Sequence, residues 1–217
     1  MKRNLFWLAL PVALIVAAAA AGCSTVYYSA WEKVGVYKRD LLKKRVVAAR
    51  DEQKEAGAQF KDALTRFKEL YNFDGGKLEK SYTTLQKTYD QSAAKAEAVH
   101  KRVRDVETVS ADLFTEWENE IKQISTASLA ASSRAELKET RARYETLHTA
   151  LRKAEATMEP VLVKFKDHVL YLKHNLNAQA IASLKGEAMN IQTDIAQLIG
   201  EMNTAIARAD EFIKEMK

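Results

Sequence analysis

The side chains best suited to binding a metal or to acid–base catalysis are four histidines, and they are scattered: His100, His148, His168 and His174. Histidines that share a metal on one helix usually stand four residues apart, whereas His148 and His168 are 20 apart. The spacing predicts no metal site, and we interpret His168, which falls on an apolar seam, as a core residue. The lone cysteine, Cys23, excludes an internal disulfide and a site built from several cysteines.

The carboxylates give no better candidate for catalysis. Glu116, Glu118 and Glu120 resemble a two-carboxylate site only in composition, and lysine and arginine neighbours one helical turn away indicate a charged helix surface. The chain has no glycine-rich phosphate loop, serine-centred elbow or zinc-binding helix motif. We therefore expect no catalytic residue, no cofactor and no enzymatic activity.

Cys23 has a different chemistry, because it follows an apolar run near the start of the chain. Lys2 and Arg3 precede the uncharged stretch 5–20, and small residues lead up to the cysteine. A basic start, a short apolar run and a small-residue exit are typical of a secretory signal. The run is short for a membrane span, and Pro11 interrupts it.

The residues before Cys23 also resemble the bacterial lipobox, in which the cysteine is acylated and becomes the first residue. We expect a signal peptide at 1–22, a lipidated tether at 23–30 and one helical domain at 31–217; an uncleaved signal anchor is the alternative. Several acyl chains on one residue would hold the protein firmly. By resemblance to Gram-negative lipoproteins, Ser24 is no inner-membrane retention signal, so for such a source we expect the periplasmic face of the outer membrane.

Composition favours long helices. The 217 residues include only two prolines and seven glycines, the residues on which frequent turns depend. Without Lys2 and Arg3, 32 basic residues face 29 acidic ones, a mixture that does not predict nucleic-acid binding.

Apolar residues recur at alternating steps of three and four along the chain, which predicts helices packed along a seam. We expect an all-α fold, an elongated antiparallel four-helix bundle with helices at about 31–71, 77–124, 133–173 and 178–217. In the alternative, the last two helices run on as one. The first seam contains Leu42, Val46, Ala49, Gln53, Ala56, Phe60, Ala63, Phe67 and Leu70; the second includes Tyr82, Tyr89, Ala96 and Trp117; the last contains Ile181, Leu184, Ala188, Ile191, Ile195, Leu198, Met202, Ala205, Ala209, Phe212 and Met216.

The interruptions between the seams carry turn and cap residues. Asn72 to Gly76 tolerates a left-handed backbone, and Ser133 with Glu136 predicts a capping box at the start of the third helix. The break at 173–177 lacks glycine. Pro160 lies inside the third seam, which keeps its phase, so we expect a kink there and no boundary.

This topology would place the turns at 72–76 and 173–177 together, about 60 Å from the lipid anchor. Their residues are candidate partner contacts, although turn and helix-end chemistry explains the same residue types. They are Asn72, Phe73, Asp74, Lys173, His174, Asn175 and Asn177. A second set lies close to the anchor and could contact an anionic membrane or form a solvated face. It comprises Lys33, Lys38, Arg39, Lys43, Lys44 and Arg45.

Several stretches resemble a family of bacterial envelope proteins known only as a domain of unknown function and often described as lipoproteins. They are Glu32–Gly35 with Lys38–Asp40, Asn72–Gly76, Leu113–Phe114 with Glu116–Glu118, Thr140–Arg141 with Arg143–Tyr144, and Leu172–Ala178. The resemblance spans most of the chain beyond Cys23 and implies a shared helical fold, but no activity.

The functional prediction is a non-enzymatic envelope lipoprotein that acts as a helical spacer, scaffold or adaptor for an envelope protein partner. The alternative is a carrier whose helices hold a lipid or another apolar ligand. Self-assembly through an exposed seam, giving a homo-oligomer, is a third possibility.

Overall fold

The computed structural model describes residues 37–72 and 78–216. In these two ranges the chain forms five α-helices and no strand, which confirms the all-α prediction. The helices are α2 (Lys38–Tyr71), α3 (Leu78–Ile121), α4 (Ala127–Ala156), α5 (Met158–His174) and α6 (Ala178–Glu215). None of these helices has the length and apolar character needed to cross a bilayer.

The chain divides into two units, residues 1–41 and 42–217. Of the first unit the structure describes residues 37–41, where the Asp40 carboxylate accepts a hydrogen bond from the Tyr37 N–H at 3.4 Å. This contact serves an N–H group that the first turn of a helix leaves without a backbone partner.

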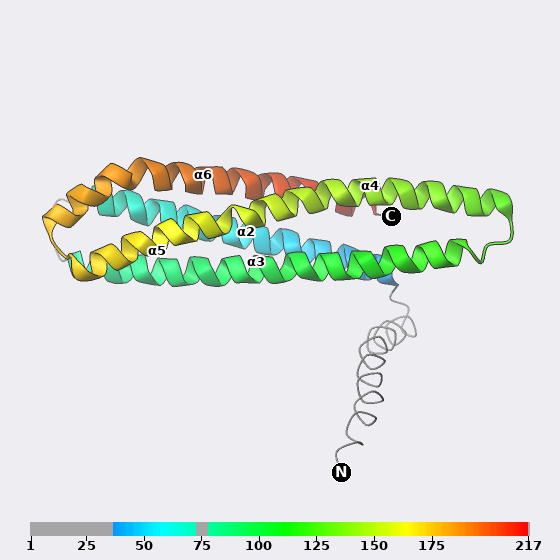
Figure 1. Ribbon diagram of the computed structural model, residues 1–217, viewed down its shortest axis with the longest axis horizontal. Coiled ribbons are helices and arrows are strands. Elements are labelled where there is room, and N and C mark those ends of the chain that lie inside the picture. The colour runs from blue at the N-terminus through cyan, green and yellow to red at the C-terminus, as the bar shows by residue number, and fades with distance from the viewer. Residues whose placement is uncertain (1–36, 73–77, 217) are drawn as a thin grey trace, which may run out of the picture. The chain divides into compact units, whose positions relative to one another are not determined.

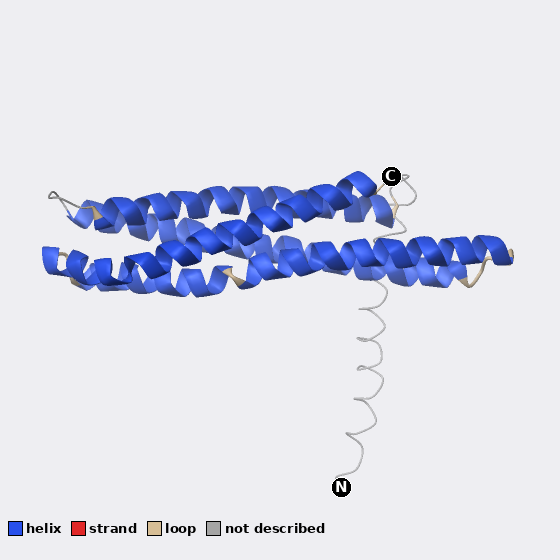
Figure 2. Ribbon diagram, turned by 90° about the horizontal axis from the view of Figure 1, so that it is seen from above, coloured by secondary structure: helices blue, strands red, loops and turns tan. Residues whose placement is uncertain are grey.

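In the second unit the helices run antiparallel in four arms, as Figures 1 and 2 show. α4 and α5 follow one another in the same direction and together make the third arm, so α2, α3, α4–α5 and α6 alternate in direction (Figure 1). The predicted antiparallel bundle is confirmed. The chain reverses between α5 and α6, so the alternative with one continuous final helix is wrong.

The core follows the predicted seams. Every residue of the first seam is buried, and so is every residue of the last seam whose side chain the structure describes. The second seam is less regular, because Tyr82, Tyr89, Ala96 and Trp117 are only half-buried. The seams pack because residues three and four apart lie on one face of a helix.

The third arm breaks before Pro160. α4 ends at Ala156 and α5 begins at Met158, so the expectation of a kink without a helix boundary was wrong. A proline in a helix interior lacks an N–H and its ring clashes with the carbonyl four residues earlier, which here belongs to Ala156. In the first turn of a new helix neither cost arises, and Pro160 is the third residue of α5.

α4 also starts earlier than the capping-box pattern predicted. It begins at Ala127, with Thr126 as N-cap, and Ser133 lies inside it. The Ser133 hydroxyl accepts a hydrogen bond from the Trp117 indole N–H at 2.8 Å. Ser133 thus joins α3 to α4 and does not cap a helix.

Candidate functional site

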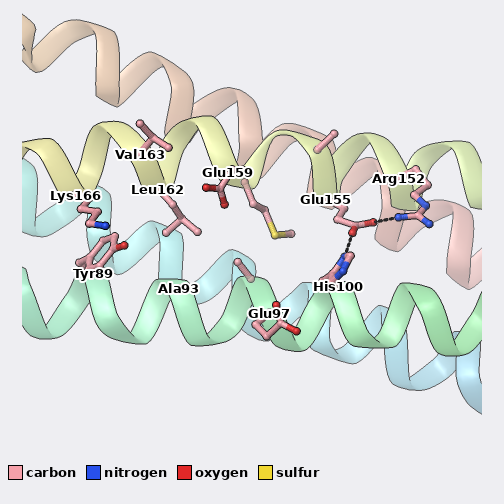
Figure 3. A pocket seen from close by; sticks show the side chains of 13 residues that line it. Tyr89, Ala93, Glu97, His100, Arg152, Glu155, Glu159, Leu162, Val163 and Lys166 are labelled. Atoms are coloured by element: carbon pink, nitrogen blue, oxygen red, sulfur yellow. Dashed lines mark hydrogen bonds and ion pairs between the residues drawn. The ribbon is translucent and has the colours of Figure 1, made fainter.

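An open groove of about 770 Å³ lies between α3 and the third arm, at the α4–α5 break (Figure 3). Its walls are mostly apolar, and charged side chains stand at the rim. It is lined by Tyr89, Ala93, Ala96, Glu97, His100, Arg152, Glu155, Ala156, Met158, Glu159, Leu162, Val163 and Lys166.

Small side chains leave this space open. Ala93 and Ala96 form the α3 wall, and Ala156 lies on the third arm just before the helix break. Met158 and Leu162 are buried at 2% and 7% exposure and pack in the third arm beneath them. An alanine methyl covers far less surface than leucine, so facing alanines leave a depression that larger residues would fill.

One end of the groove is closed by a hydrogen-bonded chain of charges. The Glu155 carboxylate pairs with His100 Nδ1 and, at 3.0 Å, with Arg152 Nη1 (Figure 3). Arg104 Nη1 lies 2.8 Å from His100 Nε2. Arginine can only donate, so Nε2 accepts and the ring hydrogen lies on Nδ1, from which it is donated to Glu155.

The same chain continues along the α3–α4 interface through Glu107. Arg152 donates to both oxygens of Glu107, each at 2.6 Å, and His148 Nε2 also lies 2.6 Å from this carboxylate. Burial acts to raise the pKa of Glu107, but the hydrogen bonds from His148 and Arg152 outweigh it and lower that pKa. Two-point arginine–carboxylate pairs are strong and directional, so this end of the groove is held rigidly.

Glu159, in the middle of the groove, and Lys166, at its other end, have no ion pair among the described residues (Figure 3). Glu159 and Lys166 both project from the α5 side of the groove, and Lys166 stands next to Tyr89 of α3 (Figure 3). Tyr89 itself packs edge-on against Phe165, with ring centroids 5.5 Å apart. The groove therefore offers an apolar floor, one free carboxylate and one free ammonium group.

This arrangement is suited to binding. Over residues 37–72 and 78–216, no group of three His, Cys, Asp or Glu side chains is placed to hold a metal. The carboxylate nearest an imidazole, Glu155, is already committed to His100 and Arg152. Apolar walls with a few fixed polar groups are typical of ligand and partner sites.

The residues predicted for partner contact lie at one end of the second unit, which we call the tip: Asn72 and residues 173–177 (Figure 1). Asn72, Lys173, His174 and Asn177 are exposed, and Asn175 is half-buried. Phe73 and Asp74 lie outside the described residues.

Two of the tip asparagines have structural roles. The Asn177 side-chain oxygen accepts from the Ala180 N–H at 2.9 Å and caps the start of α6. The Asn175 side chain donates to the Tyr171 carbonyl at 2.9 Å near the end of α5. Both satisfy groups that helix ends leave open.

Of the basic residues predicted for membrane contact, two make contacts between helices, and for three others the structure gives the exposure of the side chain. Lys43 donates to the Met216 carbonyl at 2.7 Å, and Arg45 reaches Asp105 at 3.5 Å, so both fasten α2 to neighbouring helices. Lys44 and Arg39 are exposed, and Lys38 is half-buried. Cys23 and Lys33 lie outside the described residues.

His168 and Tyr71 form a buried polar cluster beside the tip. The burial of His168 was predicted from the sequence, whereas the position of the Tyr71 hydroxyl was not. His168, a seam residue, is 7% exposed, and its Nδ1–H donates to the Lys164 carbonyl at 2.8 Å. Its Nε2 has no described hydrogen-bond partner, and neither has the Tyr71 hydroxyl, whose ring centroid lies 6.4 Å away. Burial raises the pKa of Tyr71, and the nearby charge of Glu187 adds to the effect.

The groove was not predicted from the sequence. Its α3 wall contains Tyr89 and Ala96, which fit the second seam and were expected in the core. Pro160 could have indicated the position of the groove. A proline that interrupts a helix next to alanine-rich segments marks a place where two helices pack less closely.

Comparison with known proteins places the whole bundle in one family. No curated protein matches the chain. A family model described as "Protein of unknown function (DUF2959)" matches residues 27–216, which include all five described helices. The chain therefore belongs to the DUF2959 family of proteins of unknown function.

Proposed function

We propose that this protein is a non-enzymatic lipoprotein of the cell envelope, acylated on Cys23, whose helical bundle serves as a spacer, scaffold or adaptor. For a Gram-negative source, the proposed location is the periplasmic face of the outer membrane. The bundle would hold its tip at a set position for an envelope protein partner, and Lys33, Lys38, Arg39 and Lys44 would lie against an anionic lipid surface.

The observation that carries the proposal is the unbroken core of the second unit. Buried side chains run from Leu42 at the start of this unit to Leu70, and from Ile181 to Met216 on the returning helix. α3 has 44 residues, which correspond to about 66 Å. Long antiparallel helices that share one continuous core resist bending, as a spacer requires.

Ion pairs between the arms support the same function. Arg50 on α2 reaches Asp210 on α6 at 2.8 Å, and Lys153 on α4 reaches Glu201 on α6 at 2.9 Å. Exposed pairs of this kind contribute about 0–1 kcal/mol each. Their main effect is to fix which helix faces meet, since a shifted register would separate the charges.

The anchor is tested at Cys23. In a bacterial host, the Cys23→Ser variant should lose the incorporation of labelled fatty acid and leave the membrane fraction after signal removal, because serine cannot form the thioether to diacylglycerol. Ser24→Ala, one residue away, is the matched control and should remain acylated. Equal fatty-acid labelling of Cys23→Ser and the parent would refute the lipoprotein assignment.

The adaptor role is tested at the tip, with the capping residues Asn175 and Asn177 left intact. We expect Lys173→Glu with His174→Ala to remove in-cell photo-crosslinks formed from the tip, because both side chains are exposed and available to a partner. The matched control is Lys122→Glu with Gln123→Ala, two exposed residues after α3 at the opposite end. Unchanged crosslinks in the tip variant, with normal helical content, would exclude this contact.

A carrier of a lipid or another apolar ligand is the second candidate function. The groove favours it, since its lining is mainly apolar and its volume of about 770 Å³ is that of a ligand pocket. A lipid or another apolar ligand bound in the groove would favour the carrier function over the spacer, scaffold or adaptor function.

A further inference from the structure

A second stripe of side chains follows the outer face of α5, away from the core seam. It consists of Glu159, Val163, Lys166 and Leu170, at successive steps of four, three and four. Val163 and Leu170 are 50% and 46% exposed, although both are large aliphatic residues. Residues at this spacing lie on one face of the helix, so the two aliphatic and two charged side chains form one exposed surface.

The two charges of the stripe have no ion pair among the residues that the structure describes. Glu159 and Lys166 are seven residues apart, or about 10.5 Å along the axis, on the same face of α5. At this separation they cannot pair with each other within one chain. Both side chains are exposed, so each can meet a group of the opposite sign on another molecule.

The sequence of this stripe is self-complementary. If a second α5 is laid antiparallel across the first, about a two-fold axis near Leu162 and Val163, Glu159 of each helix meets Lys166 of the other. A two-fold contact of this kind repeats every interaction twice and closes at a dimer. We propose that the groove is the docking site for a second copy of this chain, centred on Val163.

The α3 wall adds a further charge match. The contacts of Tyr89 with Phe165 and of His100 with Glu155 define the antiparallel register of α3 and the third arm. In this register Glu97 lies opposite residues 157–158, within two residues of the level of Glu159, and both line the groove (Figure 3). Lys166 of the second copy enters between two carboxylates, of which Glu97 has only a 3.6 Å contact with Arg104.

The apolar parts of the stripe match the shape of the groove. Val163 of the second copy lies over Leu162 and Ala93. Large aliphatic knobs above alanine-lined holes are the usual form of close helix packing. A bound acyl chain would cover the same floor but would leave Glu159 and Lys166 unpaired, which is why a second copy is the better occupant.

This inference goes beyond the spacer function. It concerns bundles that lie along the membrane surface, because an antiparallel pair points the two tips in opposite directions. It is tested by sedimentation equilibrium of the whole acylated protein in a density-matched detergent. The parent should be a dimer. Glu159→Lys alone and Lys166→Glu alone should each raise the dimer Kd at least tenfold, because each places like charges at both symmetric contacts. The double variant Glu159→Lys/Lys166→Glu should have a lower Kd than either single variant, because both Glu159–Lys166 pairs are re-formed with reversed sign. Its Kd should stay above that of the parent, because the new carboxylate at position 166 faces Glu97.

A monomeric parent, or a double variant as weak as either single variant, would overturn the proposal. Native mass spectrometry of the same samples decides the occupant: a monomer with one stoichiometric lipid beyond its own acyl chains would reject the dimer in favour of a carrier.

A second measurement does not depend on the charge variants. Val163→Cys lies beside the proposed axis, so an added copper oxidant should join two copies by a disulfide in native membranes. The control Leu129→Cys is 61% exposed but lies in the first turn of α4, at the end away from the tip. Equal disulfide yield from both variants would also overturn the proposal.

Discussion

Leu147→Ala should lower the free energy of unfolding by about 3–5 kcal/mol. Leu147 is 1% exposed, on the face of α4 that packs in the bundle core. The substitution removes buried methyl groups and leaves a cavity that long, rigid helices cannot close by small shifts. Loss of dispersion contacts around the cavity adds to the lost hydrophobic transfer energy.

The same α4 helix provides a chemically identical control. Leu129 is 61% exposed, so Leu129→Ala should change the free energy of unfolding by no more than about 0.5 kcal/mol. Urea unfolding followed by circular dichroism, at one fixed protein concentration, measures both variants without a contribution from altered dimer population. Similar losses in the two variants would show that the face of α4 assigned to the core is wrong.

The second large effect is a loss of stability in acid that depends on His168. Burial lowers the pKa of His168 below its ordinary 6.5, and neither the hydrogen bond to the Lys164 carbonyl nor the charges of Asp167 and Glu187 cancel this effect. The unfolded chain therefore takes up the proton at a higher pH than the folded chain. The contribution of neutral His168 to the free energy of unfolding is fully present above about pH 6.5. Below that pH it decreases by at most about 1.4 kcal/mol per pH unit, until the pH reaches the pKa of His168 in the folded chain.

The His168→Leu variant isolates this contribution. Its free energy of unfolding should fall less steeply than that of the parent from pH 7 to pH 5, because no imidazole remains to be charged in the core. His174→Leu removes an exposed imidazole from the same helix and serves as the control. Parallel pH profiles for the parent and His168→Leu would mean that the buried histidine does not drive the acid sensitivity.

The residues around His168 explain why acid should loosen the bundle near the tip first. Phe67 packs edge-on against the imidazole, with centroids 5.3 Å apart, and the Tyr71 hydroxyl nearby has no described partner. A proton on Nε2 would have to be accommodated among aromatic rings, where charge is poorly solvated.

The apolar periodicity was enough to predict which face of each helix is buried. Leu42, Phe60, Ile191 and Leu198 all occupy predicted seam positions, and all four are completely buried. This prediction is reliable because the helical repeat is a local property of the backbone, so a residue's position along the chain sets its direction around the helix axis. The reversal at 173–177 was also predicted, and within it Asn177 caps the start of α6.

Local patterns were less reliable for helix boundaries. Ser133 and Glu136 have the spacing of a capping box, yet α4 continues through them from Ala127. Pro160 preserves the seam phase, yet it separates α4 from α5. The spacing of a capping box does not fix where a helix begins, and the phase of a seam does not reveal the cost of a proline inside a helix.

The sequence alone thus determined the helical class, the buried faces and the places where the chain turns, because these depend on residues within a few positions of one another. Only the tertiary structure decided which charges meet, as when Arg152 reaches Glu107 from 45 residues away. It also decided that Gln53, a seam residue, is completely buried with no described partner for its amide. The groove and the free charges of Glu159 and Lys166 belong to this second group, since they exist only where two distant helices pack side by side.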